Sequence, residues 1–186
     1  GVQGRTNLEA MAAVNDHIEK VYAFDFYSER ANAYAKEMSE QLGLEVVAVG
    51  TPKEAAEHAD ILITAGPVVL DKDISVVEKE WLKEGVTIIT VDADVQFKQS
   101  AVQSADKFYT DDIGQFRKFR NDGCVQRITA DPAEIGDLLT GKAAGRTSQD
   151  ETIFACNIGL ALSDMAVAKV IYEKAIEQGI GQILPL

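Results

Sequence analysis

The sequence predicts an α/β fold built on a doubly wound, mainly parallel β-sheet with helices on both faces. Short apolar runs rich in β-branched residues alternate with segments of helical periodicity, which is typical of this class. The apolar runs lack regular polar alternation, as expected for strands that are buried on both faces. The chain has 186 residues, of which 46% are hydrophobic, and this suits one domain with a complete core.

Strands and helices are expected to alternate through the first half of the chain. The strands are apolar runs at residues 21–25, 44–49 and 60–65. The helices are expected at residues 4–15, at residues 28–42 and from residue 51 onward. Ser28 is a candidate N-cap of the second helix, and Gly43 is its candidate stop. Thr51 and Pro52 are residue types that open a helix, so they mark the start of the third.

The second half is expected to continue this alternation. Two strands are predicted, at residues 86–91 and, more weakly, at residues 107–110. Helical segments are predicted at residues 78–83, just before residue 107, at residues 131–139 and at about residues 160–178. Asp131 is the candidate cap of the helix over residues 131–139, with Pro132 in its first turn, and Gly179 is expected to end the last helix.

Charge and composition exclude several classes of partner. The formal net charge is -12 and the sequence pI is about 4.6, so the chain repels phosphate backbones and anionic lipid. We therefore expect neither nucleic acid nor a membrane as a partner. The two cysteines, Cys124 and Cys156, show no metal-ligand spacing, so we expect no metal site. Free thiols are expected in a cytoplasmic protein.

A glycine motif opens the chain and leads directly into the first predicted helix. Gly1 and Gly4 have the spacing of the second and third glycines of the G-x-G-x-x-G dinucleotide fingerprint. In that fingerprint the helix N-terminus presents free N–H groups and a partial positive charge to the pyrophosphate. Asp25 ends the next strand 21 residues after Gly4, where the fingerprint requires an acid for the adenosine ribose. Together these features predict a Rossmann-like dinucleotide-binding domain.

The strand that should precede the glycine motif is not part of the sequence. In the usual strand order this first strand is central, so its absence would divide the sheet into two half-sheets with exposed edges. We therefore expect the first strand to be missing from the fold and the chain to be a piece of a longer protein.

Several segments carry a family resemblance. They are GVQGR, VYAFDFYSERA, ADILITAGP, EWLKEGVTIITVDAD and EIGDLLTGKAAGRTSQDETIFACNIGLALSDMAVA. With these segments the sequence resembles the ornithine cyclodeaminase/mu-crystallin family over essentially its whole length. The resemblance implies that residues 1–186 form the dinucleotide-binding domain, and that the tail from about residue 155 packs toward a substrate-binding domain. It also implies a homodimer as the full-length protein.

The resemblance also implies roles for individual residues. Asp94 matches the acid of a G-x-D segment that handles the substrate amine, and it is the candidate catalytic residue. It also lies just past the end of a buried strand, where ligands bind in open parallel sheets. The cofactor-binding candidates are Gly1, Val2, Gln3, Gly4, Asp25, Thr64, Ala65, Gly66, Lys98 and Asn157.

The sequence departs from the family pattern at three places. Asp92 stands where glycine is usual, Gln96-Phe97 replaces proline-glycine, and Ala155-Cys156-Asn157 replaces an F-D-S segment. Since Asp92 and Asp94 are close in sequence and carry like charges, one of them is expected to point to solvent. These departures affect the expected substrate more than the expected cofactor.

The resemblance leaves three functions open. The first is an NAD-linked cyclodeaminase acting on a basic amino acid by hydride transfer, cyclisation and loss of ammonia. The second is net oxidation or reduction of an amino or imino acid by a dehydrogenase, a ketimine reductase or an opine-like enzyme. The third is a non-catalytic, crystallin-like binding protein. NAD is favoured over NADP because an acid at Asp25 repels a 2′-phosphate, and Phe26 and Tyr27 offer no charge to pair with one.

Overall fold

A computed structural model describes residues 1–70, 73–182 and 184 of the chain. The first half contains α1 (Val2–Val14), β1 (Val21–Ala23), α2 (Ser28–Leu42), β2 (Val46–Ala48), α3 (Pro52–Glu57) and β3 (Ile61–Thr64). The second half contains the 3₁₀ turn η1 (Lys79–Trp81), β4 (Thr87–Thr90), α4 (Gln99–Gln103), β5 (Lys107–Thr110), α5 (Ile113–Asn121), β6 (Ala133–Glu134), α6 (Ile135–Leu139), β7 (Ile153–Cys156) and α7 (Ala161–Glu177).

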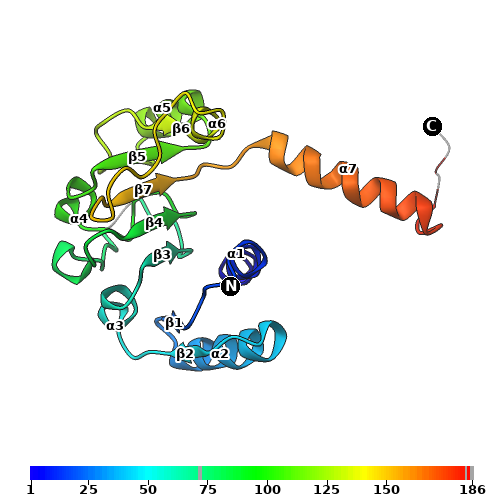
Figure 1. Cartoon of the computed structure of the whole chain (residues 1–186), viewed down its shortest axis with the longest axis horizontal. Coiled ribbons are helices and arrows are strands. Elements are labelled where there is room, and N and C mark those ends of the chain that lie inside the picture. The colour runs from blue at the N-terminus through cyan, green and yellow to red at the C-terminus, as the bar shows by residue number, and fades with distance from the viewer. Residues whose placement is uncertain (71–72, 183, 185–186) are drawn as a thin grey trace.

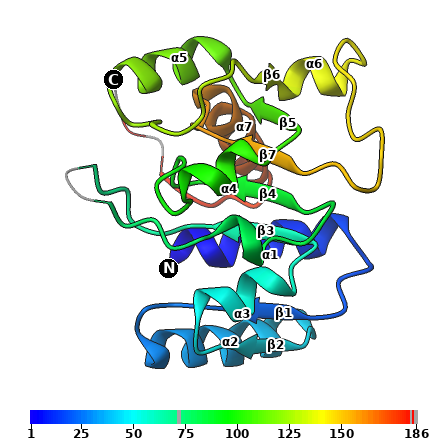
Figure 2. The same cartoon turned by 90° about the vertical axis from the view of Figure 1, so that its left-hand side faces the viewer.

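All strand pairs in the described residues are parallel, which confirms the predicted α/β class. The strands form two separate sheets. One has the order β1-β2, and the other has the order β3-β4-β7-β5-β6 (Figures 1 and 2). This division matches the two half-sheets expected when the first strand is missing. Each sheet has its own hydrophobic core, and the larger core is centred on Ile88 and Phe154, which are fully buried.

The register of the larger sheet aligns the carboxyl ends of its central strands. Thr64 of β3 lies opposite Thr90 of β4, and Thr90 lies opposite Cys156 of β7. The residues that follow these three positions therefore leave the sheet at one edge. Ligands bind at this edge in open parallel sheets, so the alignment determines which loops can form a site.

Most helix ends follow the sequence signals, with one correction at α2. Gly43 ends α2 in the left-handed conformation with a φ of 69°, and the Thr51 side chain caps α3 by accepting the N–H of Glu54 at 3.2 Å. Ser28, however, is the first helical residue and not the N-cap. Tyr27 takes the N-cap position, because its N–H donates to the Asp25 carboxylate at 2.9 Å and its backbone is extended.

The helix expected over residues 131–139 is a second correction. Residues 133–134 form β6, and the helix begins only at Ile135, with Glu134 as its N-cap. Asp131 cannot cap this helix because its carboxylate is bound by Arg117 at 2.5 Å and by Arg120 at 2.8 Å. Two elements were not predicted at all, namely α5 and the central strand β7.

The last helix, α7, projects away from the rest of the chain (Figure 1). It spans residues 161–177, as expected, and none of its residues is buried. Its large apolar side chains are more than a third exposed at Leu162, Met165, Val167, Val170, Ile171, Tyr172 and Ile176. Within the described residues, no helix is both long and apolar enough to cross a membrane.

Candidate functional site

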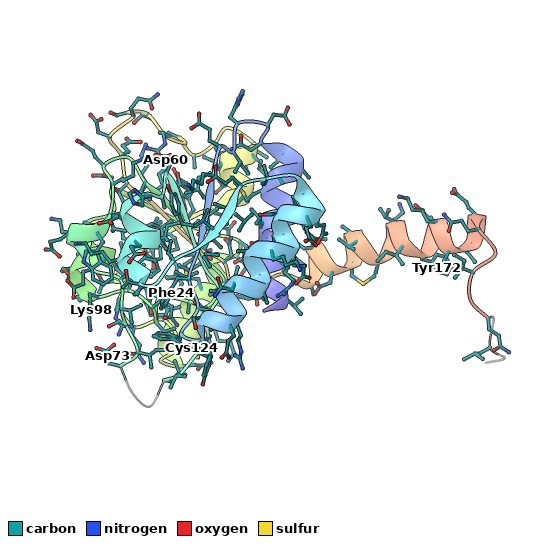
Figure 3. The ribbon with its side chains drawn as sticks, turned by 90° about the horizontal axis from the view of Figure 1, so that it is seen from below. Phe24, Asp60, Asp73, Lys98, Cys124 and Tyr172 are labelled. Atoms are coloured by element: carbon teal, nitrogen blue, oxygen red, sulfur yellow. The ribbon has the colours of Figure 1, made fainter. Side chains whose placement is uncertain are left out.

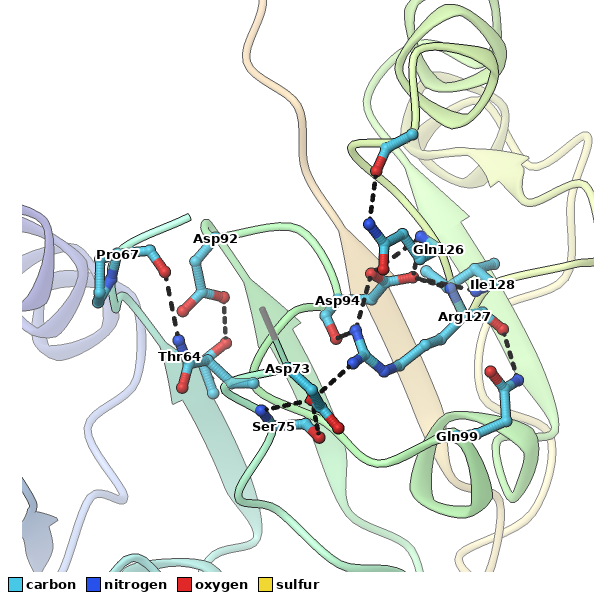
Figure 4. Close-up of polar contacts among 12 residues, drawn as sticks. Thr64, Pro67, Asp73, Ser75, Asp92, Asp94, Gln99, Gln126, Arg127 and Ile128 are labelled. Atoms are coloured by element: carbon cyan, nitrogen blue, oxygen red, sulfur yellow. Dashed lines mark hydrogen bonds and ion pairs between the residues drawn. The ribbon is translucent and has the colours of Figure 1, made fainter. Parts of the chain in front are cut away.

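The loops that follow β3, β4 and β7 form the candidate site at the carboxyl edge of the larger sheet. Residues 64–67 leave β3, residues 91–98 follow β4, and residues 157–159 follow β7. Figure 4 shows polar contacts between the first two loops, together with a third segment at residues 126–128. Six of the expected site residues lie at the end of β3 or in the loops after β3, β4 and β7. They are Thr64, Ala65, Gly66, Asp94, Lys98 and Asn157.

Asp92 is buried at this edge, with 1% of its surface exposed. Its carboxylate accepts the Thr64 hydroxyl at 2.6 Å and the Gly66 backbone N–H at 2.7 Å. Burial raises the pKa of Asp92 above its ordinary value, although these two hydrogen bonds act in the opposite direction. Asp94 is also fully buried, so the expectation that one of these two acids points to solvent is wrong. Each carboxylate instead has its own set of donors.

The donors to Asp94 are three consecutive backbone N–H groups. Gln126 donates at 3.0 Å, Arg127 at 2.6 Å and Ile128 at 3.0 Å, all to Oδ2 of Asp94. Oδ1 receives only a 3.1 Å contact from the same Gln126 N–H and lies 3.8 Å from the Arg127 guanidinium. A carboxylate offers about four lone-pair sites, so Oδ1 keeps acceptor capacity. In this conformation Asp94 holds the 126–128 segment against the loop after β4.

Ala93, between these two acids, has a left-handed backbone with a φ of 58°. No other non-glycine residue in the described part of the chain has a positive φ. Such a conformation costs about 1–3 kcal/mol and persists only when the surroundings impose it. The hydrogen bonds of Asp92 and Asp94 on either side of Ala93 provide that constraint.

Lys98 lies at the start of α4 with its side chain 42% exposed. Its ammonium group is 3.7 Å from the Asp73 carboxylate, which also binds the Arg127 guanidinium at 3.0 Å. Hydrogen bonds from Ser75, reinforced by these two cations, lower the pKa of Asp73 to about 2. Figure 3 shows Lys98 and Asp73 on the same side of the molecule, opposite Asp60. Lys98 therefore borders the site and is accessible there.

Two buried polar atoms at the edge lack a hydrogen-bond partner in the described residues. They are Oγ1 of Thr90, at the end of β4, and Oδ1 of Asn157, just after β7. The two residues are adjacent, because the Asn157 N–H donates to the Thr90 carbonyl at 3.2 Å. Asp111 fixes the chain beyond them by accepting the N–H groups of Ile158 at 3.0 Å and Gly159 at 2.6 Å. Buried polar atoms are normally paired, so this pair points to a place for a ligand or water.

The glycine motif and Asp25 belong to the smaller half of the fold. Gly1 is the N-cap of α1, and Val2 and Gln3 are exposed in its first turn, as a phosphate-binding helix start requires. Gly4 packs against α2, where its carbonyl accepts the Tyr34 hydroxyl at 3.0 Å. Asp25 follows β1 and is half-buried.

Comparison with known proteins identifies the family. The model of the ornithine cyclodeaminase/mu-crystallin family matches residues 1–179. The chain belongs to this family. The resemblance inferred from the sequence segments is therefore confirmed.

Several members of the family are similar to the chain over nearly all of its length. The delta(1)-pyrroline-2-carboxylate reductase of Bacillus cereus is 31% identical over 97% of the chain and 57% of that relative. The structure of the same-named enzyme from Thermococcus litoralis, in complex with NADH and L-proline, is 31% identical with a TM-score of 0.84, covering 99% of this chain and 58% of that one. An archaeal alanine dehydrogenase dimer with bound NAD is 28% identical with a TM-score of 0.80, covering 100% and 58%. The chain thus spans just over half the length of these relatives.

The structure adds residues to the site that the sequence had not proposed as site residues. Gln96 and Arg127 both contact the candidate site, and neither was a candidate. Thr90 was also missed, although its place at the end of a buried strand was a usable signal. Arg127 gave no such signal, because its segment follows a helix that was not predicted.

Proposed function

We propose that the chain is the dinucleotide-binding part of an NAD-dependent enzyme of this family, acting on a small α-amino or α-imino acid. The observation that carries this proposal is the 31% identity and the TM-score of 0.84 to a reductase solved with NADH and L-proline. The unpaired polar atoms of Thr90 and Asn157 support it, because they leave donor and acceptor capacity for a polar ligand at the carboxyl edge.

Each half of the fold would bind a different part of the cofactor. Gly1, Val2, Gln3 and Gly4, at the N-terminus of α1, would hold the pyrophosphate, and Asp25 would accept the adenosine ribose hydroxyls. Thr64, Ala65, Gly66, Lys98 and Asn157 would border the nicotinamide end. The cofactor supplies hydride exchange at the substrate α-carbon.

Asp94 is the proposed catalytic residue. The free acceptor capacity on its Oδ1 would receive the substrate amine, or hold a proton that the amine releases. Arg127 partly covers Asp94, with its guanidinium 3.8 Å from Oδ1, so the substrate reaches Asp94 only if this side chain shifts. The backbone donors and the Arg127 guanidinium hold the Asp94 carboxylate in one orientation at the carboxyl edge of the sheet.

Net oxidation or reduction is the reaction that the relatives favour. The reported relatives are named as reductases or a dehydrogenase, so we assign the chain first to this class. Cyclodeamination of a basic amino acid is the second candidate, because the matching family model carries that activity in its description.

One assay with the full-length protein separates these functions. Net reduction of delta(1)-pyrroline-2-carboxylate, or of pyruvate with ammonia, consumes NADH and lowers the absorbance at 340 nm. Cyclodeamination of L-ornithine instead regenerates the cofactor and releases ammonia without a change at 340 nm. Binding of NADH with neither reaction would identify a non-catalytic, crystallin-like protein. Absence of NADH binding would contradict the proposal itself.

We also propose that α7 packs on a substrate-binding domain and that the full-length protein is a homodimer. The exposed apolar side chains of α7 support this, because many large apolar side chains exposed on one helix are typical of an interface. Residues 1–186 would then form the dinucleotide-binding domain together with the tail that joins it to the substrate domain. Sedimentation of the full-length protein tests the dimer.

A further inference from the structure

Asp92 and Gln96 both lie in the loop after β4, and both contact the loop after β3. Asp92 binds that loop through the Thr64 hydroxyl at 2.6 Å and the Gly66 N–H at 2.7 Å. Gln96 donates from Nε2 to the Pro67 carbonyl at 3.4 Å. Both side chains are buried, with 1% and 6% of their surfaces exposed. Residues 64–67 are thus held on one side by two buried polar groups.

The contact between the two loops is close as well as polar. A Cβ added to Gly66 would lie 2.6 Å from Nε2 of Gln96 and 3.3 Å from Oδ2 of Asp92. A side chain at this position would have to displace the Gln96 amide and would crowd the Asp92 carboxylate. The Gly66 N–H and the Pro67 carbonyl face the loop after β4, while residues 65–67 remain exposed and accessible to a ligand.

Holding the loop after β3 with the buried Asp92 carboxylate costs free energy. A buried carboxylate loses its hydration, and the Asp94 carboxylate nearby raises its energy further. The two hydrogen bonds offset part of this cost, and the strained Ala93 adds to it. Buried charges and backbone strain of this kind are found mainly at functional sites, where the fold must keep one local geometry.

We propose that Asp92 and Gln96 form a polar latch that fixes residues 64–67 in the conformation that receives the dinucleotide, which makes them positioning residues of the cofactor site. Neither residue is placed in contact with the reacting atoms. The latch rests on the proposed function, because it needs a dinucleotide at the edge of the sheet. It adds that the shape of the β3 loop is set by side chains of the β4 loop.

The test compares NADH binding by variants of the full-length protein in a fluorescence titration. Asp92→Ala removes both hydrogen bonds and should raise the Kd for NADH by about tenfold or more, the scale of a hydrogen bond to a charged group. Asp92→Asn keeps an acceptor and the side-chain volume, so it should recover part of the affinity. Gln96→Met keeps the volume without the donor and should give a smaller increase in Kd.

Asp60→Asn is the matched control. Asp60 precedes β3 at the opposite end of that strand, where its side chain is 85% exposed and paired with Lys83 (Figure 3). This variant should leave the Kd for NADH unchanged. In turnover, the latch variants should raise the KM for NADH with little change in kcat, since they weaken binding throughout the reaction. A general loss of folded protein would instead lower kcat and leave KM unchanged.

Hydrogen exchange at the Gly66 amide separates failure of the latch from failure of the proposed function. In Asp92→Ala this amide should lose protection, because its acceptor is gone. If the unmutated protein binds no NADH, the proposed function fails, and with it the positioning role. If the unmutated protein binds NADH and both Asp92 variants bind it equally well, the latch is wrong and the proposed function stands. Should Asp92→Ala not fold, Asp92→Asn and Gln96→Met decide between these outcomes.

Discussion

The guanidinium of Arg30 lies over the Tyr27 ring, 4.4 Å from its centroid. This is within the range of a cation–π contact, so Arg30 already has a partner on the exposed side of α2. Asp25, whose carboxylate binds the Tyr27 N–H, faces the same turn. The turn therefore offers an acid to a ribose hydroxyl, while its nearest arginine is held by the ring.

We therefore expect NADH to bind more tightly than NADPH. Asp25→Asn should narrow this preference by roughly 1–3 kcal/mol, the scale of a hydrogen bond to a charged group. Parallel titrations with NADH and NADPH at fixed salt measure the difference, and Arg30→Ala is the control for the stacked arginine. Tighter binding of NADPH by the unmutated protein would contradict the assignment of Asp25.

Asp94→Asn should lower both stability and turnover. The amide oxygen of the variant can take the Oδ2 position and keep the three backbone donors, but the amide nitrogen then replaces Oδ1 beside the Arg127 guanidinium. The loss of the negative charge at this buried position should cost about 1–3 kcal/mol of unfolding free energy. Urea unfolding measures this cost, and turnover per folded molecule isolates the chemical role. Asp60→Asn, which alters an exposed acid at the opposite end of β3, is the control. Normal turnover per folded Asp94→Asn molecule would remove Asp94 from the catalytic proposal.

The pH dependence of stability should reveal the buried acid at residue 92. Its pKa is raised in the folded state, so the folded form holds the proton more tightly than the unfolded chain. This contribution is fully present below the unfolded pKa of about 3.8 and is lost as the pH rises through the folded pKa. Asp92→Asn cannot ionise, so its stability relative to the unmutated protein should improve with rising pH. If Asp92→Asn and the unmutated protein show the same pH dependence of stability in urea unfolding, the pKa of Asp92 is not raised in the folded state.

The two thiols should differ in reactivity. Burial raises the pKa of Cys156 to about 12, while Cys124 is half-buried near the end of α5. Since the thiolate is the reactive form, a thiol reagent at neutral pH should modify Cys124 in the native protein and both cysteines after denaturation. Cys124→Ser should leave no native reactivity. Rapid modification of Cys156 in the native state would show that β7 opens readily.

The isolated 186-residue chain should show no turnover of any amino acid. It spans just over half of its relatives, and the apolar surface of α7 has no partner in the described structure. The 340 nm assay tests this, with the full-length protein as the positive control. Turnover by the isolated chain would show that no further domain is needed.

Local signals predicted the elements whose own residues determine them. The apolar runs at β3 and β4, the stop of α2 at Gly43 and the N-cap of α3 at Thr51 are examples, because their causes lie within a few residues. β7 directly follows the polar segment at residues 146–152, and its place between β4 and β5 at the centre of the sheet depends on tertiary packing. The helix expected from Asp131 failed for a related reason, since the acid is bound by α5.

The candidate site also contains residues that the sequence could predict and residues that it could not. Positions at strand ends, such as Asp94, follow from the general geometry of parallel sheets. The partnership of Asp92 with Thr64 joins residues 28 positions apart and depends on the β3–β4 register, which no local pattern specifies. The sequence therefore marked Asp92 only as a departure from the family pattern and did not predict that it binds the loop after β3.

The two separate hydrophobic cores determine which part of the protein can unfold on its own. The smaller unit joins α1, α2 and β2 around Leu8 and Met38, while the larger is built around β4 and β7. Because no strand pair links the two sheets in the described structure, the smaller unit can unfold sub-globally while the larger remains intact. Amide protons of β2 should then exchange faster than those of β4. A dinucleotide spanning both units would join them into one cooperative body, so binding itself would supply rigidity that the uncomplexed fold lacks.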